Sequence, residues 1–278
     1  MRSSPNFTGS VEFARRLDSR PGIRHVLFDF DGTLSLIREG WPEVMVPLFE
    51  EWLPAKPGES PQQRRHLVIE DIMRLNGKQT IYQMIQLADR IRERGGRPED
   101  PLVYKKEYLR RLDERIRERK AQLRESGGRE DTLLVHGARA LLENLAARGL
   151  QLHLASGTDE ACVTEEARLL GVDAFFGNRI HGARDDYKSF SKKMVIDRIL
   201  EDHGVEGRDL MAFGDGYVEI ENTKHVGGLA VAVASDEAHN GSGRVDAWKR
   251  ARLLGVGADL VIPDFRDAAP LMDLILGT

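Results

Sequence analysis

The sequence predicts an α/β protein in which a doubly wound, Rossmann-like parallel sheet forms the core and an α-helical domain is inserted. Three observations support this fold class. An apolar, strand-like run at residues 24–30 ends in a turn signal, strand-like and helix-like segments alternate from about residue 150 onward, and residues 37–132 contain no convincing strand. Such alternation is typical of a parallel sheet with helices on both faces. We therefore expect residues 1–36 and 133–278 to form the core and residues 37–132 a helical domain.

The composition is that of a globular protein that builds its core without covalent cross-links. The chain has 278 residues, of which 41% are hydrophobic and 31% are charged, and its formal net charge is −4. That charge disfavours nucleic acid or an anionic membrane surface as a partner. Cys162 is the single cysteine, which excludes an intrachain disulfide. Because no signal-peptide pattern follows Met1 and no run reaches about 18 apolar residues, we expect a cytoplasmic monomer or homodimer with neither nucleic-acid nor membrane partners.

The core elements follow from apolar runs that are bounded by glycine or acidic turn residues. Short apolar runs indicate buried strands, and longer amphipathic stretches indicate helices. The predicted strands are residues 24–30, Leu150–Ala155, Ala174–Phe176, Leu210–Phe213, Leu229–Ala234 and Asp259–Ile262. The predicted helices are Asp159–Leu170, Ser191–Leu200, Glu219–Val226, Asp246–Leu254 and a last one from about Ala268.

Residues 37–132 have the composition of helices joined by glycine- and proline-containing loops, at 55–61 and 95–98. Within residues 104–125, leucine and isoleucine recur at helical spacing among nine Lys or Arg and five Asp or Glu residues. This pattern is typical of a solvated helix face with internal ion pairs. A nucleic-acid contact is less favoured, because no aromatic platform accompanies the charge.

The first of four polar clusters is Asp29-Phe30-Asp31-Gly32-Thr33-Leu34, at the end of the first predicted strand. Alternate strand residues share a face, so Asp29 and Asp31 can point into one crevice beyond the carboxyl end of the sheet. Two carboxylates in such a crevice need a cation or protons to neutralise them. Taken alone, an Asp-x-Asp turn in which both side chains bind backbone donors is the more common structure.

Two further clusters suit an anionic ligand. Ser156 and Gly157 end a predicted strand, where a hydroxyl and backbone N–H groups can bind an anion. Lys192 and Lys193 stand in the first turn of a predicted helix, where a cation opposes the helix macrodipole unless an anion is near. Taken alone, the first of these two clusters is more often an ordinary helix cap, and a surface lysine is a strong alternative for the second.

The fourth cluster, Gly214-Asp215, ends another apolar strand, and Glu219 follows four residues later. These acids offer hard oxygen ligands to a metal ion, although turn-forming acids are the alternative. The order of the four clusters is decisive. A doubly wound sheet would bring each of them to the same edge, and four independent coincidences of this kind are improbable.

With these clusters the chain resembles the haloacid dehalogenase superfamily, and specifically its phosphohydrolase branch. The resemblance rests on Asp29-Phe30-Asp31-Gly32-Thr33-Leu34, Ser156-Gly157, Lys192 and Gly214-Asp215-x-x-x-Glu219. It covers roughly residues 22–36 and 133–278. Residues 37–132 stand where this superfamily carries its helical C1-type cap domain, so the resemblance implies the same two-part organisation.

The resemblance implies a role for each matching position. Asp29 would be the nucleophile that becomes an aspartyl-phosphate, and Asp31 the acid and base that serves the leaving oxygen and then water. Asp29, Asp215 and the backbone carbonyl of Asp31 would ligate Mg²⁺. Glu219 would complete the metal site, directly or by orienting its neighbours, since aspartate is the commoner residue there. Lys192 would stabilise charge on the nucleophile and the phosphoryl group, with its neighbour in the sequence as the alternative lysine.

Substrate contacts are also implied. Ser156 and the Gly157 N–H would hold phosphate oxygens, and Thr33 of the first motif is a further substrate-binding candidate. The glycine turn that contains Lys78 and Gln79 resembles the loop by which C1 caps reach the active site. Both side chains are therefore candidates for contacting the leaving group, and a simple interhelical turn is equally compatible with the pattern.

Together these roles predict a Mg²⁺-dependent phosphomonoester hydrolase that acts on a small phosphorylated metabolite through an aspartyl-phosphate. A sugar phosphomutase on the same scaffold is the alternative. A dehalogenase is disfavoured because that branch needs neither Asp31 nor a metal. A phosphonate hydrolase would require a Schiff-base lysine in the cap, for which Lys78 is the candidate. A non-catalytic binding protein is disfavoured because the charged motif residues are all present.

Overall fold

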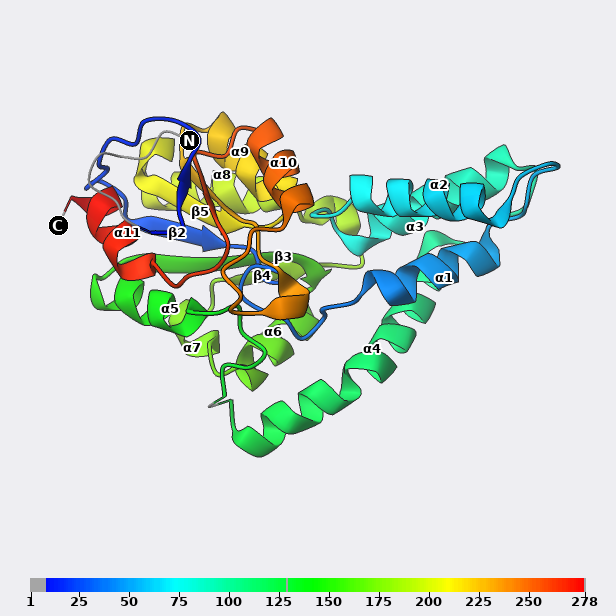
Figure 1. The fold of residues 1–278 in the computed structure, drawn as a ribbon, viewed down its shortest axis with the longest axis horizontal. Helices are drawn as coiled ribbons and strands as arrows, with labels where there is room; N and C mark the ends of the chain where they lie inside the picture. The colour runs from blue at the N-terminus through cyan, green and yellow to red at the C-terminus, as the bar shows by residue number, and fades with distance from the viewer. Residues whose placement is uncertain (1–8, 129, 278) are drawn as a thin grey trace.

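The computed structural model describes residues 9–128 and 130–277, which form an α/β core with a group of helices extending from one side (Figure 1). A seven-stranded sheet runs through the core in the order β1-β7-β6-β5-β2-β3-β4. Strands β2 to β7 are parallel, and β1 pairs antiparallel with β7. The predicted α/β fold is thereby confirmed. The strands are β1 (Glu12–Phe13), β2 (His25–Phe28), β3 (Gln151–Asp159), β4 (Ile180–Ala183), β5 (Leu210–Gly214), β6 (Leu229–Val233) and β7 (Leu260–Ile262).

Helices cover both faces of the sheet, as a doubly wound fold requires (Figure 1). One face carries α8 (Lys192–His203), α9 (Tyr217–His225) and α10 (Ala247–Gly255). The other carries α5 (Ala138–Ala147), α6 (Glu160–Leu169), α7 (Asp173–Phe176) and α11 (Ala268–Leu276). Among the described residues, no helix is both long and apolar enough to cross a membrane.

Strand β2 lies at the centre of the sheet because its sequence is an uninterrupted buried run. All four of its residues are buried, and it pairs with β3 on one side and β5 on the other. Phe28 stacks on Phe213 of β5 with ring centroids 5.1 Å apart. Since parallel strands end at one edge of the sheet, the residues that follow β2 and β5 meet there, beside the second half of β3.

Four consecutive helices follow β2 in the chain, before α5 and β3, and we call them the helical insertion. They are α1 (Pro42–Trp52), α2 (Pro61–Arg74), α3 (Thr80–Glu93) and α4 (Pro101–Ser126). Proline in the first turn starts three of them, and Ser60 and Gln63 form a reciprocal capping box at α2. Ion pairs such as Arg110–Glu114, at 2.6 Å, lie on the exposed face of α4, as predicted for the charged stretch.

The chain passes between the core and the helical insertion at one narrow neck. The Leu36 N–H donates to the Leu133 carbonyl oxygen, and the Val135 N–H to that of Leu34, each over 2.9 Å. Between these bonds Ser35 and Leu134 form an isolated antiparallel bridge. The chain therefore leaves and rejoins the core at adjacent points.

Three strand assignments differ from the sequence-based expectation. Ala174–Phe176 is wrong as a strand, because these residues lie in the short helix α7. A three-residue apolar run fits either state, and Asp173 in the first turn favours the helix. The pattern also misses β1, which has two residues, and β4, which is only half-buried along its first two residues.

Candidate active site

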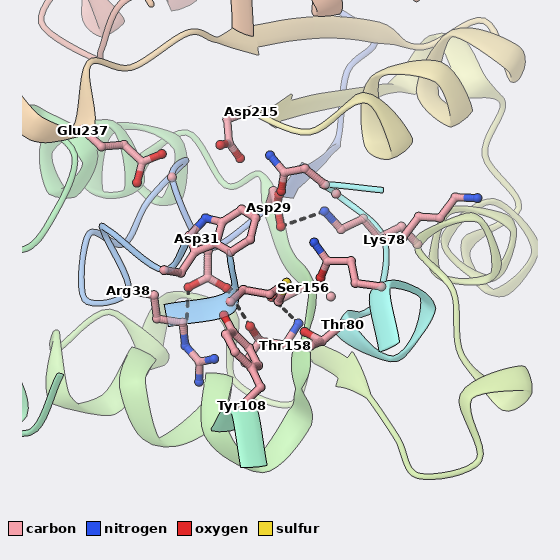
Figure 2. A pocket seen from close by; sticks show the side chains of 18 residues that line it. Asp29, Asp31, Arg38, Lys78, Thr80, Tyr108, Ser156, Thr158, Asp215 and Glu237 are labelled. Carbon is pink, nitrogen blue, oxygen red and sulfur yellow. Dashed lines mark hydrogen bonds and ion pairs between the residues drawn. The ribbon is translucent and has the colours of Figure 1, made fainter. Parts of the chain in front are cut away.

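A pocket opens at the carboxyl edge of the sheet, between the core and the helical insertion (Figure 2). Residues of all four clusters found in the sequence line it, and residues of the insertion close its other side. The lining residues that matter here are Asp29, Asp31, Arg38, Lys78, Tyr108, Ser156, Gly157, Thr158, Lys192, Asp215 and Glu237.

Lys192 is a buried cation held between two buried carboxylates. Its Nζ lies 2.8 Å from Asp29 Oδ1 and 2.8 Å from Glu219 Oε2. Lys193, by contrast, is exposed and forms its ion pair within α8. The structure therefore brings Lys192, not Lys193, to Asp29.

Glu219 is fully buried, and both of its carboxylate oxygens are engaged. Oε1 accepts a hydrogen bond from the Gly216 N–H (2.7 Å), and Oε2 accepts one from Lys192 (2.8 Å). This arrangement caps the start of α9 and fixes the Lys192 ammonium at the same time. Glu219 thus orients Lys192, while its carboxylate still lies within 4.8 Å of those of Asp29 and Asp215.

Burial and pairing decide the charges of Asp29 and Lys192. Removal from water raises the pKa of Asp29 well above its usual value, and the neighbouring Lys192 opposes part of that rise. Burial disfavours the charged form of Lys192, but the carboxylates of Asp29 and Glu219 outweigh it and raise the pKa of Lys192. Lys192 is therefore a fixed positive charge, suited to stabilising negative charge that accumulates beside Asp29.

Asp31 follows Asp29 by two residues and lies near Ser156 and Thr158 (Figure 2). Its Oδ2 accepts hydrogen bonds from Thr158 Oγ1 (2.7 Å) and Ser156 Oγ (3.4 Å). Its Oδ1 makes no hydrogen bond to any residue that the structure describes, although Arg38 Nε lies 3.7 Å away. Burial raises the pKa of Asp31 against the opposing effect of Arg38. A carboxyl group of this kind can hold and release a proton.

The raised pKa of Asp31 predicts a pH-dependent stability difference for Asp31→Asn in metal-free buffer. Between its unfolded and folded pKa values, the folded state binds more protons, so the free energy of unfolding falls as the pH rises through that window. Below the unfolded value, about 3.9, the carboxyl is protonated in both states and this loss disappears.

We therefore expect Asp31→Asn to unfold at a higher temperature than the wild type at pH 8, with a difference that shrinks toward pH 4. Thermal denaturation followed by circular dichroism across this range checks it. Parallel profiles for the two proteins would contradict the assignment of a raised pKa to Asp31.

Asp215 is fixed through both of its carboxylate oxygens. Thr33 Oγ1 donates to Oδ1 (3.2 Å) and accepts from the Asp215 N–H (2.9 Å). Lys249 Nζ lies 3.0 Å from Oδ2 and 2.6 Å from Glu237 Oε1. A Cβ at Gly32, where φ is +72°, would lie 2.3 Å from Asp215 Oδ2, so this turn needs glycine. Thr33 is fully buried and positions Asp215, and it is not among the described residues that line the pocket.

The donors at this edge suit a hard divalent cation. Carboxylate oxygens of Asp29, Asp215 and Glu219 lie within 4.8 Å of one another, and oxygen ligands of this type are preferred by Mg²⁺. Asp29 and Asp215 line the pocket, whereas the fully buried Glu219 is not among its described lining residues. Asp29 and Asp215 are therefore the two carboxylates best placed to ligate such an ion.

Ser156 and Gly157 lie in the second half of β3, which continues to Asp159 instead of ending at Ala155. Both residues line the pocket. Ser156 Oγ accepts a hydrogen bond from the Thr158 N–H (3.0 Å). A Cβ on Gly157 would lie 2.5 Å from the carbonyl oxygen of Lys78, so glycine lets the loop before α3 approach β3 closely.

That loop is anchored to the core. Gln79 Nε2 donates to the carbonyl oxygens of Tyr187 (2.9 Å) and Phe190 (2.7 Å). Gln79 is buried, is not among the described residues that line the pocket, and in this structure docks the loop on the core. Lys78 does line the pocket, but it extends away from Asp29 (Figure 2), and its Nζ lies 5.6 Å from the centre of the Tyr82 ring.

Four further side chains at the site carry no motif and are missed by sequence reasoning: Arg38, Tyr108, Glu237 and Lys249. In the sequence pattern, Tyr108 fits the buried face of a helix and Arg38 fits a loop, so neither pattern indicates a functional site. A signal for Lys249 does exist, because it stands in the first turn of α10. A lysine in the first turn of a helix is also the feature that marks Lys192.

The comparison with protein families agrees with the geometry of this site. Residues 23–227 match the model of the haloacid dehalogenase-like hydrolases. The chain belongs to this family. The match covers the first motif, the helical insertion and the Asp215–Glu219 cluster, and it confirms the resemblance inferred from the motifs. No curated protein matches this haloacid dehalogenase-like hydrolase.

Solved structures share the fold of this hydrolase at low sequence identity. A predicted phosphoglycolate phosphatase from Haemophilus somnus 129pt is 16% identical, with a TM-score of 0.57 over 90% of this chain and 98% of the other. A proposed β-phosphoglucomutase from Bacteroides vulgatus is 14% identical, with a TM-score of 0.58 over 92% and 91%. The proposed HAD-hydrolase YfnB from Bacillus subtilis, bound to magnesium, is 15% identical, with a TM-score of 0.56 over 90% and 99%.

Proposed function

We propose that this haloacid dehalogenase-like hydrolase is a Mg²⁺-dependent phosphomonoester hydrolase that acts on a small phosphorylated metabolite. The observation that carries the proposal is the pair of carboxyl groups in one pocket with different surroundings. Asp29 is ion-paired with the fixed cation Lys192, whereas Asp31 accepts hydrogen bonds from the hydroxyls of Thr158 and Ser156 and has one oxygen free of hydrogen bonds to the described residues. Such a pair supplies a nucleophile and a separate proton carrier.

The reaction proceeds in two steps. In the first, a carboxylate oxygen of Asp29 attacks phosphorus, the bond from phosphorus to the leaving oxygen breaks, and Asp31 gives its proton to that oxygen. In the second, Asp31 takes a proton from water, the water oxygen attacks phosphorus, and the bond to Asp29 breaks to release inorganic phosphate. Lys192 stabilises the negative charge in both steps, while Ser156 Oγ and the Gly157 N–H hold phosphate oxygens.

The carboxylates of Asp29 and Asp215, with the Asp31 carbonyl oxygen, would hold Mg²⁺. When bound, the ion reduces the repulsion between the anionic nucleophile and the phosphate. Thr33 and Lys249 keep the Asp215 carboxylate in place for this purpose.

Asp215→Ala should weaken Mg²⁺ binding by about tenfold or more, because loss of even an indirect partner of a metal ligand typically costs 10- to 100-fold in affinity. Isothermal titration calorimetry of the two proteins with MgCl₂ measures this. Asp236→Ala, which removes a carboxylate outside the pocket lining, is the matched control. An unchanged Mg²⁺ affinity in Asp215→Ala would remove Asp215 from the metal site.

The function itself is tested by incubating the protein with Mg²⁺ and a panel of phosphorylated metabolites, with p-nitrophenyl phosphate as a generic substrate. We expect release of inorganic phosphate that stops on addition of EDTA. If Mg²⁺ binds in calorimetry and yet no panel member yields phosphate, the hydrolase proposal fails.

A sugar phosphomutase is the second candidate, and the likeness to the proposed β-phosphoglucomutase favours it. The same aspartyl-phosphate would then return its phosphoryl group to a sugar hydroxyl instead of to water. Phosphorus NMR of a sugar phosphate incubated with the protein separates the two, since a mutase yields an isomeric sugar phosphate and a hydrolase yields free phosphate.

A further inference from the structure

Three histidine rings meet at the edge of the sheet opposite the pocket. His25 begins β2, His153 lies on the adjacent strand β3, and His203 ends α8, which covers this face (Figure 1). His25 and His153 are buried, at 3% exposure each, and His203 is exposed. His25 precedes Asp29 by four residues of extended chain, about 13 Å. The cluster is therefore separate from the acidic site.

The ring nitrogens have the spacing of metal ligands. His25 Nδ1 and His153 Nε2 lie 3.2 Å apart, and one nitrogen from each of the three rings lies within 4.8 Å of the others. In a tetrahedral zinc site, metal–nitrogen bonds of about 2.0–2.1 Å place the donor nitrogens about 3.3–3.4 Å apart. The observed distance between His25 Nδ1 and His153 Nε2 is close to this nitrogen–nitrogen distance, so small side-chain rotations suffice to accommodate an ion.

The surroundings leave the two buried rings uncharged. Burial lowers the pKa of His153 to about 3, and burial together with His203 lowers that of His25. Arg179 and Asp209 place one charge of each sign near the cluster. Among the described residues, the three histidine rings make one hydrogen bond, which joins His25 to His153. Neutral imidazoles with lone pairs are the form that binds metals.

We propose that His25, His153 and His203 form a binding site for a divalent transition-metal ion of the zinc type, with water as a fourth ligand. Imidazole nitrogens favour such ions over Mg²⁺. Bound there, the ion would tie the last turn of α8 to β2 and β3. Since α8 begins at Lys192 and β2 leads to Asp29, the ion would hold together the two elements that carry this ion pair.

The test is a Zn²⁺ titration of the full-length protein, stripped of metal, by isothermal titration calorimetry. Every protein in the series carries Asp215→Ala, which weakens the acidic site so that the tightest Zn²⁺ binding reports on the histidines. In this background we expect one equivalent of Zn²⁺ to bind and to raise the melting temperature. His203→Ala should weaken binding by at least about tenfold. His203 is exposed, so this variant keeps its fold, which circular dichroism in EDTA verifies.

His225→Ala is the matched control, because His225 is also an exposed histidine in the last turn of a helix on the same face. It should bind Zn²⁺ like the background protein. Co²⁺ gives a second readout, since ligation by histidines in four-coordinate geometry produces intense visible bands that octahedral oxygen sites lack. Absence of Zn²⁺ binding in the background protein, or equal affinity in His203→Ala, would overturn the proposal and leave a hydrogen-bonded histidine pair.

Discussion

Asp29→Asn should reduce turnover of p-nitrophenyl phosphate by on the order of a thousandfold or more. An amide oxygen is a far weaker nucleophile than a carboxylate, and the amide cannot form the aspartyl-phosphate. The fold should survive the change, because Lys192 keeps its second carboxylate partner, Glu219, at 2.8 Å. Steady-state release of p-nitrophenol measures the loss, and mass spectrometry of the wild type quenched during turnover should detect a phosphoryl adduct on the intact protein and locate it at position 29 in its peptides.

Asp185→Asn is the matched control, since Asp185 is exposed and lies outside the pocket lining. It makes the same chemical change and should retain wild-type turnover. Substantial activity in Asp29→Asn would refute the role of Asp29, as would a phosphoryl adduct on a different residue.

Lys192→Met should lower kcat by about a hundredfold or more, the effect seen when one charge-stabilising donor is removed from an active site. The substitution also leaves Asp29 and Glu219 buried without their shared cation. Breaking a buried ion pair in this way costs about 3–5 kcal/mol in the free energy of unfolding. Enzyme kinetics and urea denaturation measure the two effects separately.

Lys193→Met provides the comparison within the same helix turn. Lys193 is 56% exposed and pairs with Asp197 along α8, and an exposed pair contributes at most about 1 kcal/mol. We expect this variant to keep both activity and stability. Equal losses in the two variants would mean that α8 acts as a whole and that Lys192 has no individual role.

The sequence is sufficient to predict that the acidic residues at the ends of the core strands meet in one pocket. Asp29 and Asp215 follow uninterrupted apolar runs, and the rule that parallel strands end at one edge brings them together without any coordinates. The choice of Lys192 over Lys193 also follows from helix geometry, because the positions three and four residues after Lys192 are apolar and buried.

The partners of the motif residues could not be predicted in the same way. Thr33 lies 182 residues from Asp215 in the sequence, and their hydrogen bonds depend on how β2 and β5 are placed side by side. Gln79 stands in a polar loop that suits either a ligand or a docking contact, and only the position of the Tyr187–Phe190 segment decides between them. Local pattern carries no information on such distant pairings.

The neck formed by residues 34–36 and 133–135 has an evolutionary consequence. The helical insertion leaves the core and rejoins it at neighbouring positions. It can therefore become longer or shorter, or be exchanged, while β2 and β3 keep their places. The pocket residues of the four motif clusters all lie outside the helical insertion, whereas Lys78, Thr80 and Tyr108 of the insertion also line the pocket. Under the proposed function, selection can therefore change which metabolite is accepted without disturbing the chemistry performed on it.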